Sequence, residues 1–149
     1  KNQMTDKSAE AQHLMQLGYS SKAVELYQNQ VNVGVINDSD TDAVFLSPKG
    51  DLTRLYIKIN GAIIKDAKFL CYGCPGSLSA MSALTLLIKG KTLTQASRIT
   101  EDDILEALNG LPESKKGCTE LPIKTLRKAL VVYEKLQHPS EFSSFINNR

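Results

Sequence analysis

The sequence predicts an α+β fold, in which one three-stranded antiparallel sheet is packed by helices. Short apolar or alternating segments, which are typical of strands, occur between residues 43 and 71. An Asn-Gly pair at residues 60–61 separates the two longer segments and favours a hairpin. From residue 77 onward the apolar residues recur at helical spacing. Strands grouped before helices are typical of α+β domains rather than of alternating α/β folds.

The chain divides into a central domain and two short terminal segments. Residues 1–18 form an N-terminal extension that can be helical over residues 7–17, where Gly18 would end it. Residues 19–137 form the domain, and residues 138–149 form a C-terminal tail. The domain opens with a helix that Ser20 can cap and that runs through Tyr27.

Three strands are expected in the middle of the chain. Residues 43–46 are a short apolar run, and residues 52–59 alternate between apolar and polar side chains. Asn60-Gly61 predicts a type I′ turn, in which both central residues need a positive φ. The returning strand covers residues 62–71, and one of its faces carries Ile63, Ala67, Phe69 and Cys71.

Four helical segments should follow, at residues 77–89, 92–97, 100–109 and 119–137. Ser77 is the predicted N-cap of the first segment, and Gly90 is its predicted terminator. The last segment carries an apolar stripe made of Ile123, Leu126, Leu130, Tyr133 and Leu136.

Composition and charge restrict the classes of partner. The 149 residues are 42% hydrophobic and carry a net charge of +2, without a stretch dense in arginine or lysine. We therefore expect no nucleic-acid partner. The longest apolar stretch, around residues 83–88, is far shorter than the roughly 20 residues of a membrane-spanning helix, so we expect no membrane partner either.

Three cysteines, an odd number in a chain without a secretory signal, predict reduced thiols in the cytoplasm or an organelle matrix. The first residue is lysine, so an upstream segment could have been removed. Cys74 and Cys118 each precede a predicted helix, whose amide donors favour metal ligation and nucleophilic sulfur. Asp51 can add an oxygen ligand. These side chains could hold zinc or part of an iron–sulfur cluster, and the metal-free alternative of buried and capping cysteines stays open.

A series of short segments carries a more specific pattern. They are Tyr19-Ser20, Glu25-Leu26-Tyr27, Asn32-Val33-Gly34, Gly50-Asp51, Ile63-Ile64-Lys65-Asp66-Ala67-Lys68-Phe69, Tyr72-Gly73-Cys74, Lys89-Gly90-Lys91 and the segment from Leu111 to Cys118. In this order they resemble the IscU/NifU family of iron–sulfur cluster assembly scaffolds. The resemblance implies a scaffold, not an enzyme, that receives sulfur from a cysteine desulfurase, builds a 2Fe-2S cluster and passes it to apo-proteins. It also implies that Asp51, Cys74 and Cys118 bind iron or the cluster, with Cys118 as the sulfur acceptor.

The sequence departs from the family pattern in three places. Lys49 stands where the family has its first ligand cysteine, and Gly117 replaces a histidine. The chaperone-recognition motif Leu-Pro-Pro-Val-Lys is altered to Leu111-Pro112-Glu113-Ser114-Lys115, which remains a candidate chaperone segment. If residues 49 and 51 share one face of a strand, the Lys49 ammonium could pair with Asp51 and supply the charge of a metal. The alternative is a solvated surface lysine.

Two other functions stay open at this stage. The chain could be a degenerate adaptor that binds the desulfurase without assembling a cluster. It could also hold zinc with Asp51, Cys74, Cys118 and one exogenous ligand. Cys71 forms a Cys-x-x-Cys pair with Cys74, but it shares a face with Ala67 and Phe69, so we expect it to be a core residue.

Overall fold

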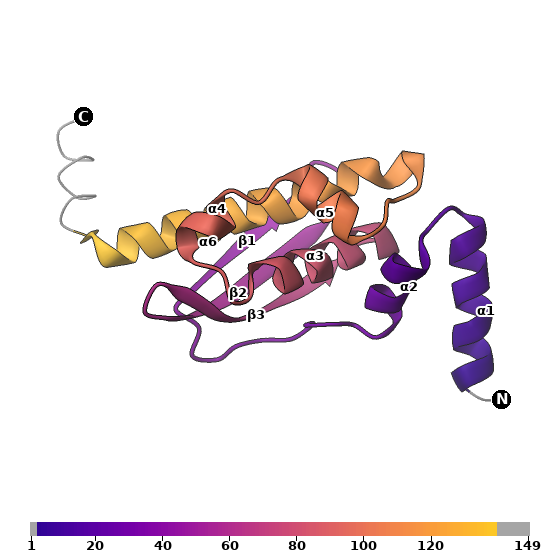
Figure 1. The fold of residues 1–149 in the computed structure, drawn as a ribbon, viewed down its shortest axis with the longest axis horizontal. Coiled ribbons are helices and arrows are strands. Elements are labelled where there is room, and N and C mark those ends of the chain that lie inside the picture. Colours follow the sequence, from indigo (N-terminus) through magenta and orange to yellow (C-terminus); the bar gives the residue numbers. More distant parts are fainter. Residues whose placement is uncertain (1–2, 140–149) are drawn as a thin grey trace.

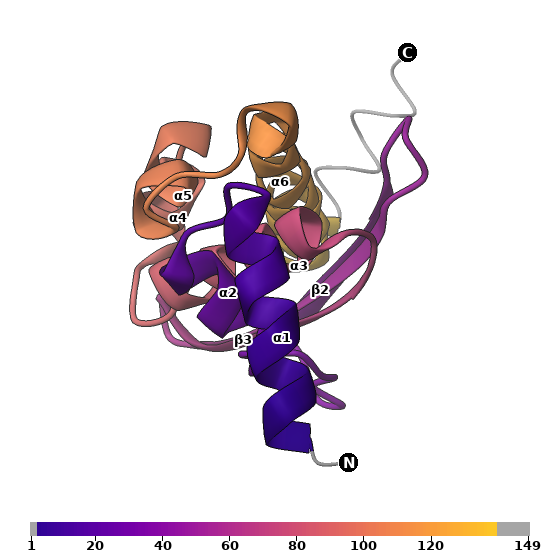
Figure 2. The same cartoon turned by 90° about the vertical axis from the view of Figure 1, so that its right-hand side faces the viewer.

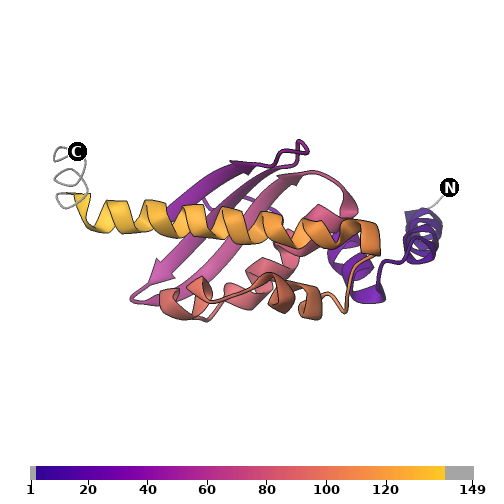
Figure 3. The ribbon, with the colours of Figure 1, turned by 90° about the horizontal axis from the view of Figure 1, so that it is seen from above.

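A computed structural model describes residues 3–139, so most of the predicted C-terminal tail lies outside the described residues. The described part has a sheet with two long helices against one of its faces (Figure 1, Figure 3). The sheet contains β1 (Thr41–Leu46), β2 (Leu52–Asn60) and β3 (Ile63–Tyr72) in the antiparallel order β1-β2-β3. This confirms the predicted α+β class and its three-stranded sheet.

Two helices precede the sheet. They are α1 (Gln3–Gln16), which stands at one end of the molecule, and α2 (Ser21–Gln28) (Figure 1). Ser20 caps α2 as predicted, because its hydroxyl accepts a hydrogen bond from the Ala23 amide at 3.0 Å. The side-chain amide of Gln28 joins the two helices by donating to the Lys7 carbonyl at 2.7 Å.

The hairpin between β2 and β3 is present, but its turn lies one residue later than predicted. Asn60 pairs with Ile63, so the two central residues of the turn are Gly61 and Ala62. Gly61 has a φ of +67° and Ala62 does not have a positive φ. A type I′ turn needs positive φ at both positions, whereas a turn with glycine at the first position alone does not. The predicted type I′ turn is therefore wrong.

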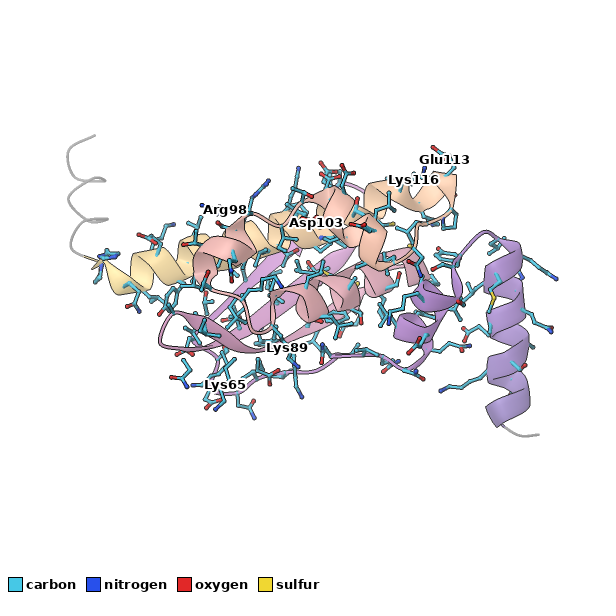
Figure 4. The ribbon with its side chains drawn as sticks, viewed as in Figure 1. Lys65, Lys89, Arg98, Asp103, Glu113 and Lys116 are labelled. Carbon is cyan, nitrogen blue, oxygen red and sulfur yellow. The ribbon has the colours of Figure 1, made fainter. Side chains whose placement is uncertain are left out.

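A β-bulge at Lys65 changes which side chains of β3 are buried. Lys58 pairs with Asp66 and Ile59 with Ile64, so Lys65 is an extra residue whose side chain is exposed (Figure 4). Ile64 is consequently buried, and Ile63 is 41% exposed, against the predicted parity. Beyond the bulge the parity holds, and Cys71 is half-buried against the core as expected.

The helices after the sheet follow the expected order. They are α3 (Pro75–Ile88), α4 (Leu93–Ser97), α5 (Glu101–Ala107), the 3₁₀ helix η1 (Glu113–Thr119) and α6 (Glu120–Gln137). The predicted cap of α3 is wrong, because Cys74 occupies the N-cap position and Pro75 the first turn. Proline is favoured in the first turn, where amide donors lack partners. Ser77 is instead fully buried inside the helix.

Helix α3 is the centre of the core. Viewed from the end that carries α1, α3 and α6 lie over the same face of the sheet (Figure 2). Helix α3 also contacts α2, α5 and η1, and most of its side chains are buried. Its sequence contains no charged residue, and its buried hydroxyls are satisfied internally, as where Ser82 donates to the Val31 carbonyl at 2.8 Å.

Helix α6 is held on the sheet by buried threonines. The hydroxyl of Thr41 donates to the Ala129 carbonyl at 2.7 Å, and the hydroxyls of Thr53 and Thr125 are 2.7 Å apart. These contacts hold the middle of α6 against the sheet. Helix η1 runs directly into the start of α6. Across residues 3–139, we find no helix with the length and apolar character needed to cross a bilayer.

The burial of Cys71 against the core predicts the effect of a serine substitution there. We expect Cys71→Ser to lower the free energy of unfolding by about 1 kcal/mol, because it places a hydroxyl against the core. Urea denaturation of the reduced, metal-free protein measures the value. An unchanged or higher free energy of unfolding would contradict the assigned position of Cys71.

Candidate functional site

The two predicted site cysteines meet at the N-terminal end of α3. Cys74 is the N-cap residue of α3, and Cys118 lies near the end of η1. Their sulfur atoms are 3.9 Å apart, although 44 positions separate them in the sequence. Both side chains are half-buried. The fold thus brings the two thiols into contact.

Ser77 joins the third predicted residue, Asp51, to the thiols. The Ser77 hydroxyl donates to the Asp51 carboxylate at 3.3 Å and lies 3.6 Å from the Cys74 sulfur and 3.7 Å from the Cys118 sulfur. The Ser77 hydroxyl therefore bridges the Asp51 carboxylate and the two sulfurs. Within the described residues, however, no three histidine, cysteine, aspartate or glutamate side chains are placed to hold one metal ion. The side chains are gathered, but not as a preformed metal site.

Two glycines make this close approach sterically feasible. A Cβ atom on Gly76 would lie 3.2 Å from the Cys118 sulfur and 3.4 Å from the Tyr19 hydroxyl. A Cβ atom on Gly73 would lie only 2.8 Å from a carboxylate oxygen of Asp51. A side chain at either position would therefore displace the atoms that make these contacts.

The two thiols share one proton unequally. A hydrogen bond from the Cys118 thiol is the largest influence lowering the pKa of Cys74 to about 4, with further help from Ser77 and the nearby charge of Lys115, against partial burial. The same hydrogen bond and burial raise the pKa of Cys118. Cys74 is therefore the thiolate of the pair, and Cys118 carries the proton. Burial raises the pKa of Cys71 to about 12, so Cys71 remains a thiol.

Lys49 does not make the ion pair with Asp51 that strand parity predicted. It is exposed in the turn between β1 and β2, and β2 begins only at Leu52. The turn is closed by Ser47, whose hydroxyl accepts a hydrogen bond from the Asp51 amide at 3.0 Å. Among the described residues no ion pair joins Lys49 and Asp51. The alternation rule fails here because the two residues are not in a strand.

Lys115, which the sequence interpretation assigned to a chaperone segment, is the cation that acts on the thiols. The negative charge of Cys74 is the main cause that raises the pKa of Lys115. Lys115 and Cys118 are three residues apart in η1, and side chains at this spacing eclipse one another in a 3₁₀ helix. An ion pair between Glu113 and Lys116, 3.1 Å long, spans the exposed side of η1 (Figure 4). Had a 3₁₀ helix been expected at Glu113–Thr119, its three-residue repeat would have placed the Lys115 ammonium on the same side as the Cys118 thiol.

A pocket of about 290 Å³ opens beside Cys118. Lys49 and Asp51 line it from the turn before β2, and Glu120 and Lys124 line it from the first turns of α6. Lys124 pairs with Glu120 at 3.4 Å. Cys74 is not among the lining residues, so Cys118 is the thiol that faces the pocket. Lys49 thus shares a pocket with Asp51 and Cys118, although it pairs with neither.

Comparisons with known proteins place the chain in a family. The model of the NifU-like N terminal domain matches residues 18–139. The iron-sulfur cluster assembly scaffold protein IscU 1 of Archaeoglobus fulgidus is 41% identical over 116 residues, which are 77% of this chain and 76% of that protein. The corresponding IscU of Escherichia coli is 35% identical over 123 residues, covering 79% of this chain and 95% of its own.

A solved structure shares the fold at low sequence identity. The N-terminal part of a NifU-like protein from Brucella abortus superposes with a TM-score of 0.67 at 15% identity, covering 82% of this chain and 98% of that one. The family match spans most of the residues that the structure describes, and it includes all three cysteines. The chain belongs to the family of NifU-like N-terminal domains, which confirms the resemblance found in the sequence.

Proposed function

We propose that this protein is an iron–sulfur cluster assembly scaffold that accepts sulfur at Cys118 from a cysteine desulfurase. Cys74, Cys118 and Asp51 would then hold iron or a 2Fe-2S cluster as cargo, to be passed to apo-proteins. One observation carries the proposal, namely the 3.9 Å contact between two thiols, one of which, Cys118, lines a pocket that Asp51 also lines. The relatives named as scaffold proteins support it.

The donor set suits iron or a cluster, although it is incomplete. Iron–sulfur clusters are held mainly by cysteine thiolates and usually take four protein ligands. Cys74 and Cys118 supply two sulfurs, and Asp51 supplies an oxygen once the Ser77 hydroxyl turns away from its carboxylate. A fourth position would be left for an exogenous ligand. The positive charge of Lys115 near Cys74 must also give way, because it and a metal would compete for the same sulfur.

A second candidate is a scaffold-like adaptor that binds the desulfurase or a zinc ion without assembling a cluster. It is favoured by Lys49, which stands at the position of the missing cysteine and adds positive charge to the pocket. In either case the segment from Leu111 to Lys115 remains the candidate for chaperone recognition. Its C-terminal residues lie in η1, next to Cys118.

Anaerobic reconstitution separates the scaffold from the adaptor. With ferrous iron, cysteine and a cysteine desulfurase, the wild-type protein should develop visible cluster absorption. Cys74→Ser and Cys118→Ser should lose it, because each removes one of the two sulfurs in contact. Cys71→Ser is the matched control and should behave as wild type, since Cys71 packs against the core. Desulfurase binding without absorption in any of these proteins would favour the adaptor.

Lys49→Cys should raise the iron or zinc content of the purified protein toward about one equivalent per chain, because it adds a second thiol to the pocket that Cys118 and Asp51 line. Elemental analysis of protein purified without chelator provides the measurement. Lys65→Cys adds an exposed thiol at the bulge, at the opposite end of β3 from Cys74, and controls for nonspecific thiol binding. Equal metal content in Lys49→Cys and Lys65→Cys would be evidence against the site.

Gly76→Ala tests whether the spacing of the two sulfurs matters. The new methyl group would sit 3.2 Å from the Cys118 sulfur, which must move by a few tenths of an ångström. We expect less than half of the wild-type cluster content after reconstitution, with helix α3 still formed because alanine favours helices. Gly117→Ala is the matched control, because a Cβ atom there meets nothing within 4 Å. If the two variants retain the same cluster content, the contact does not position a ligand.

A further inference from the structure

The contact between Cys74 and Cys118 is also the geometry of a dithiol pair. A disulfide bond is about 2.05 Å long, so the two sulfurs need to approach by only about 2 Å from their separation of 3.9 Å. They belong to different elements, the start of α3 and the end of η1, so a bond between them would join two helices. The buried Ser77 contacts both sulfurs and can hydrogen-bond to either one.

The two cysteines differ in what can reach them. Cys118 lines the pocket of about 290 Å³, whereas Cys74 does not and lies against Cys118 and Ser77. A sulfur donor entering by the pocket would therefore meet Cys118 first. The outer sulfur of a persulfide on Cys118 would have room in the pocket, while Cys74 would contact the inner sulfur.

We propose that Cys74 resolves a persulfide carried by Cys118 and thereby releases sulfide without an external reductant. The Cys74 sulfur attacks the inner, Cys118 sulfur. A Cys74–Cys118 bond forms, and the bond to the outer sulfur breaks. The outer sulfur leaves with the electron pair as HS⁻, so it is reduced while Cys74 is oxidised. This inference rests on the proposed role of Cys118 as sulfur acceptor and adds a chemical step to it.

Lys49 is the cation of the pocket that is placed to stabilise the leaving group. Two lysines and two carboxylates line the pocket, but Lys124 pairs with Glu120 at 3.4 Å, whereas no ion pair among the described residues joins Lys49 to Asp51. Positive charge near a departing anion stabilises the charge that develops during the step. The disulfide that remains must be reduced before the next turnover, and a dithiol, whether small or a protein, can supply the two electrons. Each released sulfide therefore consumes one equivalent of dithiol.

The test is a single turnover of the full chain without metal, thiol reductant or oxygen. Persulfide is loaded in parallel reactions by a cysteine desulfurase that already carries its own persulfide and has been separated from free cysteine, and by a small-molecule persulfide donor. Released sulfide is measured, and intact mass spectrometry without reduction reports either an added sulfur or the loss of two hydrogens. Cys74→Ser is the informative variant, because serine is a favoured N-cap and should keep α3 intact. Cys71→Ser is the matched control.

Wild type and Cys71→Ser should release about one sulfide per chain and end as the Cys74–Cys118 disulfide. Cys74→Ser should keep the added sulfur on Cys118 and release at least tenfold less sulfide. A stable persulfide on wild-type Cys118 would overturn the inference and leave the proposed acceptor role intact. If only the small-molecule donor loads Cys118, a cysteine desulfurase is not the partner. The sulfide released after loading by the small-molecule donor would then still test the resolving role of Cys74. Equal release from wild type and Cys74→Ser would also refute the resolving role.

Discussion

The burial of helix α3 is the constraint on which the site depends. A helix without charged residues and apolar around most of its circumference is stable only when other elements cover it. The sheet, α2, α5, α6 and η1 supply that cover. The packing of α3 therefore fixes the position of its N-terminal end, and with it the position of its N-cap residue, Cys74. The position of the first sulfur is therefore set by the core and not by the surface loop that precedes it.

The second sulfur is positioned differently, by a short 3₁₀ helix between α5 and α6. Hydrogen bonds from the Thr41 hydroxyl to the Ala129 carbonyl and between the Thr53 and Thr125 hydroxyls hold α6 on the sheet, and η1 continues into α6 without a break. Helix η1 can approach α3 closely because Gly76 has no side chain at the place where the Cys118 sulfur lies. The first cysteine is thus carried by a buried α-helix and the second by a short 3₁₀ helix.

Sequence patterns predicted the parts of the structure that depend on local periodicity, namely the strands, the long helices and the burial of Cys71. The errors share one physical cause, since each residue lies where the regular repeat is interrupted. The bulge at Lys65 exchanges the faces of β3 on either side of it. Lys49 lies in a turn, where alternation does not apply. Ser77 and Lys115 acquire their roles only when the start of α3 meets η1, a contact between distant segments that no local pattern encodes.

The electrostatics of the site imply that sulfur chemistry and metal binding compete. Without a metal, the negative charge of Cys74 is compensated by Lys115 and by hydrogen bonds from Cys118 and Ser77. A metal ion would need the same sulfur, would bring its own positive charge next to Lys115, and would have to share the pocket with Lys49. Like charges held close together in a partly buried site repel one another strongly. A sulfur atom attached to Cys118 adds no positive charge, so the proposed sulfur carriage needs neither Lys115 nor Lys49 to move away, whereas the proposed metal binding does.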